Sequence, residues 1–194
     1  MITRNALESP NFVHTAPLQV WTAAPNVYIW TAWKDTGAPV ANIDWYIAEI
    51  RRVIPILTGG RFEAGQFETG PNQRPPTPGW INVQFDHSGN WSFLGANPGQ
   101  LQLGSDHTCN QYAVIHEFGH AMGFWHTNQR PSVMGGGLGV CAPIPLSAEE
   151  ERIAKTMYSR PRGNLDPDRD PAGFASLIPN DPRPVRVTCD HIVK

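Results

Sequence analysis

The chain is organised around the stretch His116-Glu117-Phe118-Gly119-His120-Ala121-Met122-Gly123-Phe124-Trp125-His126. If this segment begins as a helix, His116 and His120 lie one turn apart on the same face, where two imidazoles can bind one metal ion. Gly123 can adopt the left-handed conformation that ends a helix, so the chain can turn sharply and bring His126 to the same ion. Zinc suits imidazole nitrogen, and a hydrolytic zinc site keeps its fourth position for water. We therefore expect a Zn²⁺ site with Glu117 beside it.

The spacing of these residues resembles the metzincin signature H-E-x-x-H-x-x-G-x-x-H, and all five defining positions are present. Ser132-Val133-Met134, which ends eight residues after His126, resembles the metzincin Met-turn. In that family the methionine lies beneath the three histidines as an apolar floor, which implies that Met134 and Gly123 support the site. The resemblance implies a zinc-dependent endopeptidase, in which a metal-activated water hydrolyses a peptide bond and Glu117 is the general base.

The branch of the metzincin clan is not assigned by these residues. Thr127 follows the third histidine and matches none of the residues that commonly distinguish the branches. Astacins and serralysins have a tyrosine two residues after the Met-turn methionine, where this chain has Gly136. Matrixin zymogens carry an N-terminal cysteine switch, whereas no cysteine precedes Cys109 here. The resemblance therefore stops at the level of the clan.

Composition narrows the classes of partner. The chain has 194 residues, which suits one catalytic domain with a substantial core. Its net charge is −2 and only 16% of its residues are charged, so nothing suggests a nucleic-acid surface or a polybasic membrane patch. No apolar run approaches the ~20 residues of a membrane span. We expect a monomer that acts on peptides or proteins.

Nineteen prolines, eighteen glycines and seven tryptophans favour a loop-rich domain of extracellular type. Metzincins are generally exported, yet residues 1–10 lack the apolar core of a secretory signal. We therefore expect a secreted protein, either with its signal already removed or with another export route.

Hydrophobic periodicity predicts an α+β fold. Strands are expected at 26–33, 61–68, 80–86, 91–95 and 100–103, with a backing helix at 41–54 that Pro55 ends or kinks. The active-site helix is expected over 112–122, with Thr108 and Gln111 as its capping box, and Ser147 with Glu150 caps a further helix over 147–159.

The resemblance implies how these elements are arranged. A twisted mixed β-sheet with the backing helix and the active-site helix would form an upper subdomain to about residue 123. A smaller irregular C-terminal subdomain, with the Met-turn and a C-terminal helix, would follow from about residue 124. We expect residues 1–160 to form this metzincin-like catalytic domain and residues 161–194 to be a polar, Pro-rich tail.

The substrate is expected to bind along residues 91–95, as an added strand beside an open sheet edge. Trp91, Ser92 and Phe93 are the candidates to contact it. Tyr112 lies one turn before His116, at a position that shapes the depth of the specificity pocket in matrixins. A core position for the Tyr112 ring is the alternative.

Three cysteines are present, and their spacing does not fit a Cys-type zinc site. Cys109 and Cys141 bracket the active-site helix and the Met-turn, so they are candidates for a disulfide in an oxidising compartment. For Cys189, pairing with either of them or a surface position is the simpler expectation. The sharper hypothesis is that the tail folds back and the Cys189 thiolate takes the water position, which would keep the enzyme latent.

A calcium site is weakly suggested in the tail. Asp166, Asp168 and Asp170 alternate like the start of a Ca²⁺ loop. Pro171 and Leu177, however, stand where an EF-hand loop needs Gly and Glu, so a solvated loop is favoured.

Two other functions remain open. The first is a non-catalytic, zinc-stabilised binding module of the same fold; Glu117 argues against it, because three histidines could hold a structural zinc without a carboxylate. The second is an enzyme that uses the same chemistry on a non-peptide amide or ester.

Overall fold

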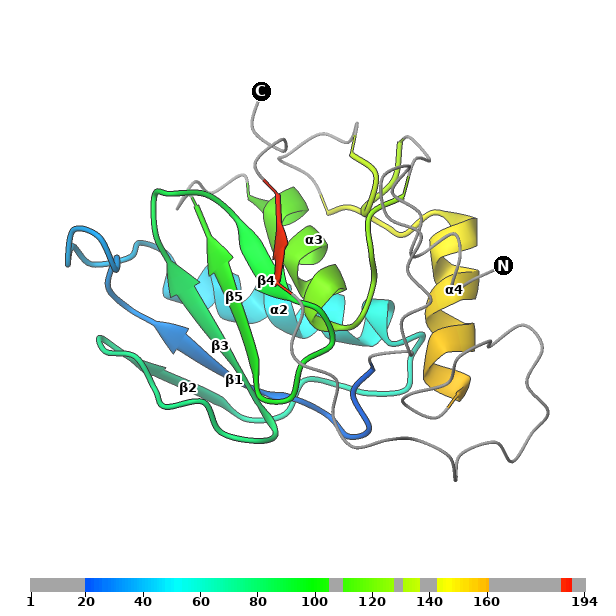
Figure 1. Cartoon of the computed structure of the whole chain (residues 1–194), viewed down its shortest axis with the longest axis horizontal. Helices are drawn as coiled ribbons and strands as arrows, with labels where there is room; N and C mark the ends of the chain where they lie inside the picture. The colour runs from blue at the N-terminus through cyan, green and yellow to red at the C-terminus, as the bar shows by residue number, and fades with distance from the viewer. Residues whose placement is uncertain (1–19, 105–109, 128–130, 137–142, 161–185, 190–194) are drawn as a thin grey trace.

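One mixed sheet and three helices make up the described part of the chain (Figure 1). The computed structural model describes residues 20–104, 110–127, 131–136, 143–160 and 186–189. The strands are β1 (Asn26–Trp30), β2 (Phe67–Gly70), β3 (Trp80–Phe85), β4 (Trp91–Phe93), β5 (Gly99–Leu103) and β6 (Arg186–Thr188), and the helices are α2 (Ile43–Leu57), α3 (Gln111–Ala121) and α4 (Ala148–Ser159). The expected combination of a mixed sheet with helices is present, and it is compatible with a metzincin-like domain.

The sheet has the strand order β2-β1-β3-β5-β4-β6. Strands β2, β1, β3 and β5 are parallel, whereas β4 is antiparallel to both β5 and β6. We expected residues 91–95 to form an open edge strand, and this is wrong. Strand β4 ends at Phe93, and β6 pairs along its outer side. The strand that covers it comes from the segment that we expected to be a polar tail.

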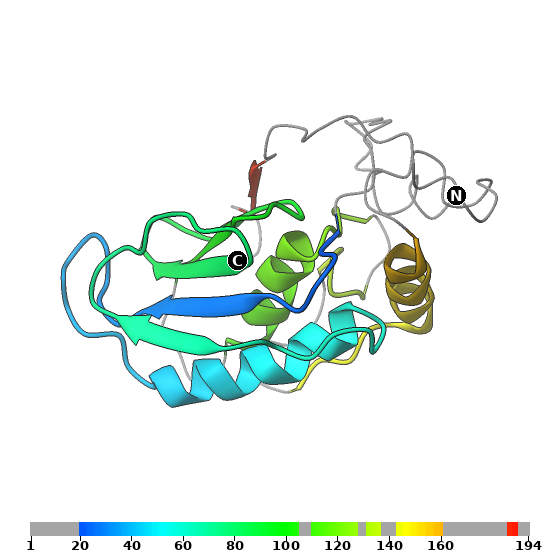
Figure 2. The ribbon, with the colours of Figure 1, turned by 90° about the horizontal axis from the view of Figure 1, so that it is seen from below.

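Helix α2 packs its apolar stripe against the sheet, as its periodicity predicted. Tyr46, Ile50, Val53 and Ile54 are fully buried, and Figure 2 shows α2 lying along one face of the strands. We expected Pro55 to end or kink this helix, but α2 continues to Leu57. Pro55 lies in the last turn, so the carbonyl that loses its donor belongs to the exposed Arg51, where water can reach it.

Helix α3 is buried from Tyr112 to Ala121, and it contacts helix α2 as well as strands β4 and β5. Its N-cap is Asn110, without a capping hydrogen bond from the side chain. The sequence placed the N-cap at Thr108, which lies outside the described residues, and put Gln111 in the third helical position; Gln111 is instead the first helical residue. The other capping box is confirmed: Ser147 caps α4 and Glu150 completes the reciprocal hydrogen bond.

Two expectations fall on residues that the structure does not describe. They are the proposed disulfide between Cys109 and Cys141 and the weak calcium motif of Asp166, Asp168 and Asp170. Among the described residues, none of the helices combines the length and the apolar character that crossing a membrane requires.

Candidate metal centre

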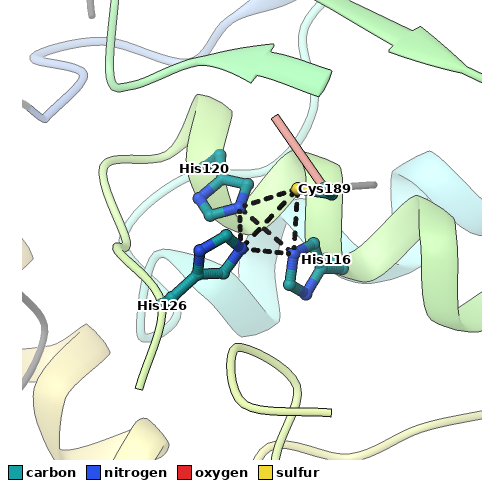
Figure 3. A group of neighbouring side chains, drawn as sticks. All are labelled: His116, His120, His126 and Cys189. Carbon is teal, nitrogen blue, oxygen red and sulfur yellow. Dashed lines mark hydrogen bonds between the residues drawn. The ribbon is translucent and has the colours of Figure 1, made fainter. Parts of the chain in front are cut away.

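Three histidine side chains converge at the end of α3. The Nε2 atoms of His116 and His120 are 3.1 Å apart, and each lies 3.2 Å from Nε2 of His126. His116 and His120 are buried on consecutive turns of the helix, and His126 reaches them from the segment that follows (Figure 3). The predicted ligand set is thus gathered at one point.

The protonation of two of these rings follows from their other nitrogens. Nδ1 of His116 lies 2.7 Å from the carbonyl oxygen of Val133, and Nδ1 of His120 lies 2.7 Å from that of Phe124. A carbonyl only accepts, so both Nδ1 atoms carry the proton and both Nε2 atoms present lone pairs. Lone pairs held 3.1 Å apart in a buried place repel each other unless a cation or a shared proton lies between them, so the arrangement suits a group that could hold a metal ion.

Zinc fits the observed spacing. Zn–N bonds of roughly 2.0–2.1 Å at the tetrahedral angle would set the nitrogens about 3.3–3.4 Å apart. The observed separations of 3.1–3.2 Å are close to this. The carbonyl partners of His116 and His120 are also the kind of outer contact that orients metal-binding imidazoles.

The sharp turn after α3 is stabilised by hydrogen bonds to the last carbonyls of the helix. The carbonyl of His120 accepts from Gly95, that of Ala121 from the Trp21 indole, and that of Met122 from the Tyr158 hydroxyl. Gly123 then adopts a φ of 104°, which side chains with a Cβ rarely adopt. The chain reverses there, and His126 is brought back toward α3.

Residues 132–136 form a tight turn under the histidines. Ser132 and Gly136 exchange two backbone hydrogen bonds, of 3.1 and 2.9 Å. The Met134 side chain is buried and packs against α3 at Gly119, where a Cβ would lie only 2.5 Å from its sulfur. The turn thus supplies both the carbonyl of Val133 to His116 and an apolar group under the helix.

Glu117 is fully buried next to His116 in the chain. Burial raises the pKa of this carboxyl to about 8. Among the described residues, neither carboxylate oxygen has a partner in normal hydrogen-bond geometry. A buried acceptor without such a partner is typical of a group that acts on something else in the site.

Cys189 lies at the same point. Its Sγ is 3.4 Å from Nε2 of His116, 3.4 Å from that of His120 and 3.6 Å from that of His126. It is a buried thiol with 1% of its surface exposed, so the expectation of a surface position is wrong. The three histidines and Cys189 together form a group that could hold a metal ion (Figure 3).

Of the candidate substrate residues, Tyr112 contacts this group. The Tyr112 ring is buried, and its hydroxyl is 3.3 Å from Nδ1 of His116. Trp91 and Ser92 are buried and Phe93 is half-buried, on a strand that pairs on both sides.

Sequence reasoning found the capping role of Glu150 but missed a second one. Its Oε1 accepts the backbone N–H of Met134 at 3.0 Å, while Oε2 accepts from Ser147. The sequence pointed to Glu150 only through the capping box. No local pattern indicates that Oε1 of Glu150 accepts from a turn sixteen residues earlier in the chain.

Comparisons with known proteins converge on one family. Residues 67–133, about a third of the chain, match the family model described as Astacin, a family of peptidases. The chain is 48% identical over 40 residues to the zinc metalloproteinase nas-26 of Caenorhabditis elegans. Those 40 residues are 20% of this chain and 10% of that protein. It is 38% identical over 52 residues to the zinc metalloproteinase nas-36 of Caenorhabditis briggsae, covering 26% of this chain and 8% of that protein.

These matches support the resemblance to metzincin proteases and are more specific than the residues alone, since they point to the astacin branch. They span only a tenth or less of the relatives' length. The matched segment also ends at residue 133, before Gly136, the position where a tyrosine was expected of astacins.

Proposed function

We propose that this chain is a zinc-dependent endopeptidase. The observation that carries the proposal is the convergence of three imidazole Nε2 atoms, 3.1–3.2 Å apart, with the buried carboxyl of Glu117 next to His116. The astacin match and the names of the relatives support the same activity. The substrate is taken to be a peptide or protein for the same reason.

The roles of the residues follow from their chemistry. His116, His120 and His126 would hold the ion through Nε2, and the carbonyls of Val133 and Phe124 would keep two of the rings oriented. A zinc ion bound there supplies Lewis acidity toward water and toward the carbonyl oxygen of the substrate. Glu117 takes a proton from the attacking water and passes it to the leaving amine. One water is consumed as the C–N bond breaks, giving a carboxylate and an amine.

The test compares Glu117→Gln with the parent chain. Because Sγ of Cys189 lies where the water would be needed, both forms are also made with Cys189→Ala. Digestion of a random peptide library is followed by mass spectrometry, with zinc content measured on the same samples. We expect Glu117→Gln to keep zinc and folding while cleavage falls at least about 100-fold, as for loss of a general base. Equal cleavage with Gln at this position, or no cleavage by any form, would overturn the proposal.

His126→Ala tests the ligand set separately. It is the one histidine of the three that is not on α3 and is only half-buried, so its loss leaves the helix unchanged. We expect a reduced zinc content in the folded variant. A full zinc complement would reject His126 as a ligand.

A second candidate function is favoured by one observation. Three histidines and a cysteine make a closed set of four ligands, as in structural zinc sites. A non-catalytic zinc-stabilised binding module would therefore show the same cluster. In that case Cys189→Ala lowers thermal stability and zinc content and no form cleaves peptides, whereas an endopeptidase gains activity.

The finer points of substrate binding belong to the same proposal. They are Tyr112 as a wall of the specificity pocket and Trp91, Ser92 and Phe93 as the strand along which a substrate pairs. Met134 and Gly123 as supports of the zinc site, export from the cell and a monomeric state are likewise proposed.

A further inference from the structure

Cys189 lies at the apex of a tetrahedron whose base is formed by the three histidines. Thiolate and imidazole on one tetrahedral zinc, with bonds of about 2.3 and 2.0–2.1 Å, would stand about 3.5–3.6 Å apart. The observed Sγ to Nε2 distances are 3.4, 3.4 and 3.6 Å. Figure 3 shows the sulfur facing all three ring nitrogens rather than one. This arrangement is that of a fourth ligand and not of a chance neighbour.

The backbone around Cys189 holds the sulfur in this place. Strand β6 runs antiparallel to β4, with Phe93 opposite Arg186 and Trp91 opposite Thr188. The pairing continues one residue further, because the N–H of Cys189 donates to the carbonyl of Asn90 at 3.1 Å. Asn90 is itself anchored, since its side-chain oxygen accepts from Gly104 at 2.7 Å. The position of Cys189 therefore follows from main-chain hydrogen bonds.

Packing adds to this anchoring. Cys189 and Leu94 form a small buried cluster, and the half-buried Trp125 packs against it. Leu94 directly follows β4, and Trp125 directly precedes the third histidine. Cys189 is thus in contact with the segment that follows β4 and with the segment that carries His126.

We propose that Cys189 is the fourth metal ligand and that β6 occupies the side of β4 along which a substrate would pair, so that the chain as folded is latent. The inference rests on the proposed peptidase function and names its regulation. A hydrolytic zinc site needs its fourth position for water, and a thiolate there excludes it. An extended peptide that adds to a sheet needs an unpaired strand edge, and β6 covers that edge of β4.

The same contacts predict how activation proceeds. Ligation deprotonates the thiol, so the S–H proton is released when the sulfur binds. If β6 left β4, the fourth ligand position would be open to water, and the released thiolate would take up a proton from solvent. Both the ligand position and the strand edge become available in one step, because they are blocked by one segment. A substrate would then run antiparallel to β4, in the direction of β6.

The test reads the metal's ligands directly and does not depend on activity. The full chain is loaded with Zn²⁺ for X-ray absorption, and with Co²⁺ for the near-ultraviolet thiolate-to-cobalt band. Three forms are compared: the parent, Cys189→Ser, and the matched control Cys109→Ser/Cys141→Ser, in which Cys189 is the sole thiol. We expect one sulfur per zinc at about 2.3 Å in the parent and the control and none in Cys189→Ser. Absence of sulfur in the parent, or its persistence in Cys189→Ser, would overturn the fourth ligand.

Peptide cleavage is measured on the same samples, together with Cys189→Ala and a chain that ends at residue 185. We expect both of these to cleave at least about tenfold faster than the parent, because water regains the fourth position on the metal. A parent as fast as Cys189→Ala would overturn the latency and leave the proposed peptidase standing. A zinc–sulfur bond in the parent, with no cleavage by any form, would overturn the peptidase and the latency with it.

Discussion

Oε1 of Glu150 accepts the backbone N–H of Met134 at 3.0 Å, which ties helix α4 to the turn under the metal centre. The same carboxylate accepts from Ser147 through Oε2 and so completes the cap of α4. One buried side chain therefore fixes both the start of a helix and the turn whose Val133 carbonyl orients His116.

Glu150→Ala should weaken both the cap of helix α4 and the turn that contains Met134. Leaving buried N–H groups without an acceptor costs about 1–3 kcal/mol each, so we expect the free energy of unfolding to fall by at least about 2 kcal/mol. Loss of an outer contact of a ligand lowers zinc affinity by about 10–100-fold. Urea unfolding and competition with a chromogenic chelator measure the two effects. Glu151→Ala, on the exposed side of the same helical turn, is the control and should change neither. Equal effects of the two variants would show that the contact with Met134 contributes nothing.

Local patterns predicted most of what lies near the histidines. The one-turn spacing of His116 and His120 and the glycine at position 123 are properties of single segments, and the structure brings those residues together as expected. The cap of α4 was predicted for the same reason, since Ser147 and Glu150 are three residues apart.

The contacts that were missed are long-range. Strand β6 has only three residues, Arg-Val-Thr, too few for an alternation to stand out from a Pro-rich segment. It is a strand because β4 offers it backbone partners about 95 residues away, and nothing local encodes such pairing. The hypothesis that Cys189 reaches the metal site came from its chemistry, and the sequence held no sign of the strand that carries it.

Gly119 allows α3 to lie directly on Met134. A Cβ at this position would stand 2.5 Å from Sδ and 3.2 Å from Cε of Met134. An alanine in the middle of a helix otherwise stabilises it by about 0.5–1 kcal/mol relative to glycine. We expect Gly119→Ala instead to destabilise the fold by about 1–2 kcal/mol, because the core is overpacked.

A double-mutant cycle isolates this contact. In a Met134→Ala background the added methyl group meets no sulfur, so Gly119→Ala should become neutral or stabilising there. Urea unfolding of the four proteins gives the coupling energy. The same cost for Gly119→Ala in both backgrounds would mean that Met134 is not what the methyl group meets.

Tyr158 makes the stability of the fold depend on alkaline pH. Its hydroxyl donates to the carbonyl of Met122 at 2.8 Å, and burial raises the pKa of the phenol well above its ordinary value of 10.0. The folded state therefore keeps its proton at a pH where the unfolded chain has lost it. This contribution to stability is fully present below about pH 10 and is lost as the pH rises beyond it.

Tyr158→Phe should separate the stability that the hydrogen bond contributes at neutral pH from the loss of stability at alkaline pH. At pH 7 we expect a loss of about 1–2 kcal/mol, because the carbonyl of Met122 keeps no donor from this side chain. Between about pH 9.5 and 11, however, the variant should lose less stability than the parent chain. Urea unfolding at both ends of this range provides the comparison. Parallel slopes for the two proteins would contradict the assignment to Tyr158.

The pairing of β6 with β4 can be tested by substituting two neighbouring residues of β6, because only one of them donates a backbone hydrogen bond to β4. Hydrogen-bonded pairs alternate along an antiparallel ladder. Since the N–H of Cys189 donates to Asn90, the N–H of Val187 also points to β4, and that of Thr188 points away.

Proline removes the N–H at either position and favours an extended backbone before it. Val187→Pro should therefore break the ladder, whereas Thr188→Pro should leave it intact. We expect Val187→Pro to weaken the thiolate-to-cobalt band and to raise peptide cleavage several-fold, with Thr188→Pro close to the parent in both measurements. Circular dichroism verifies that both variants fold. If the two prolines have the same effect, the strand does not hold Cys189 on the metal, and the sulfur must be retained by its own bond to the ion.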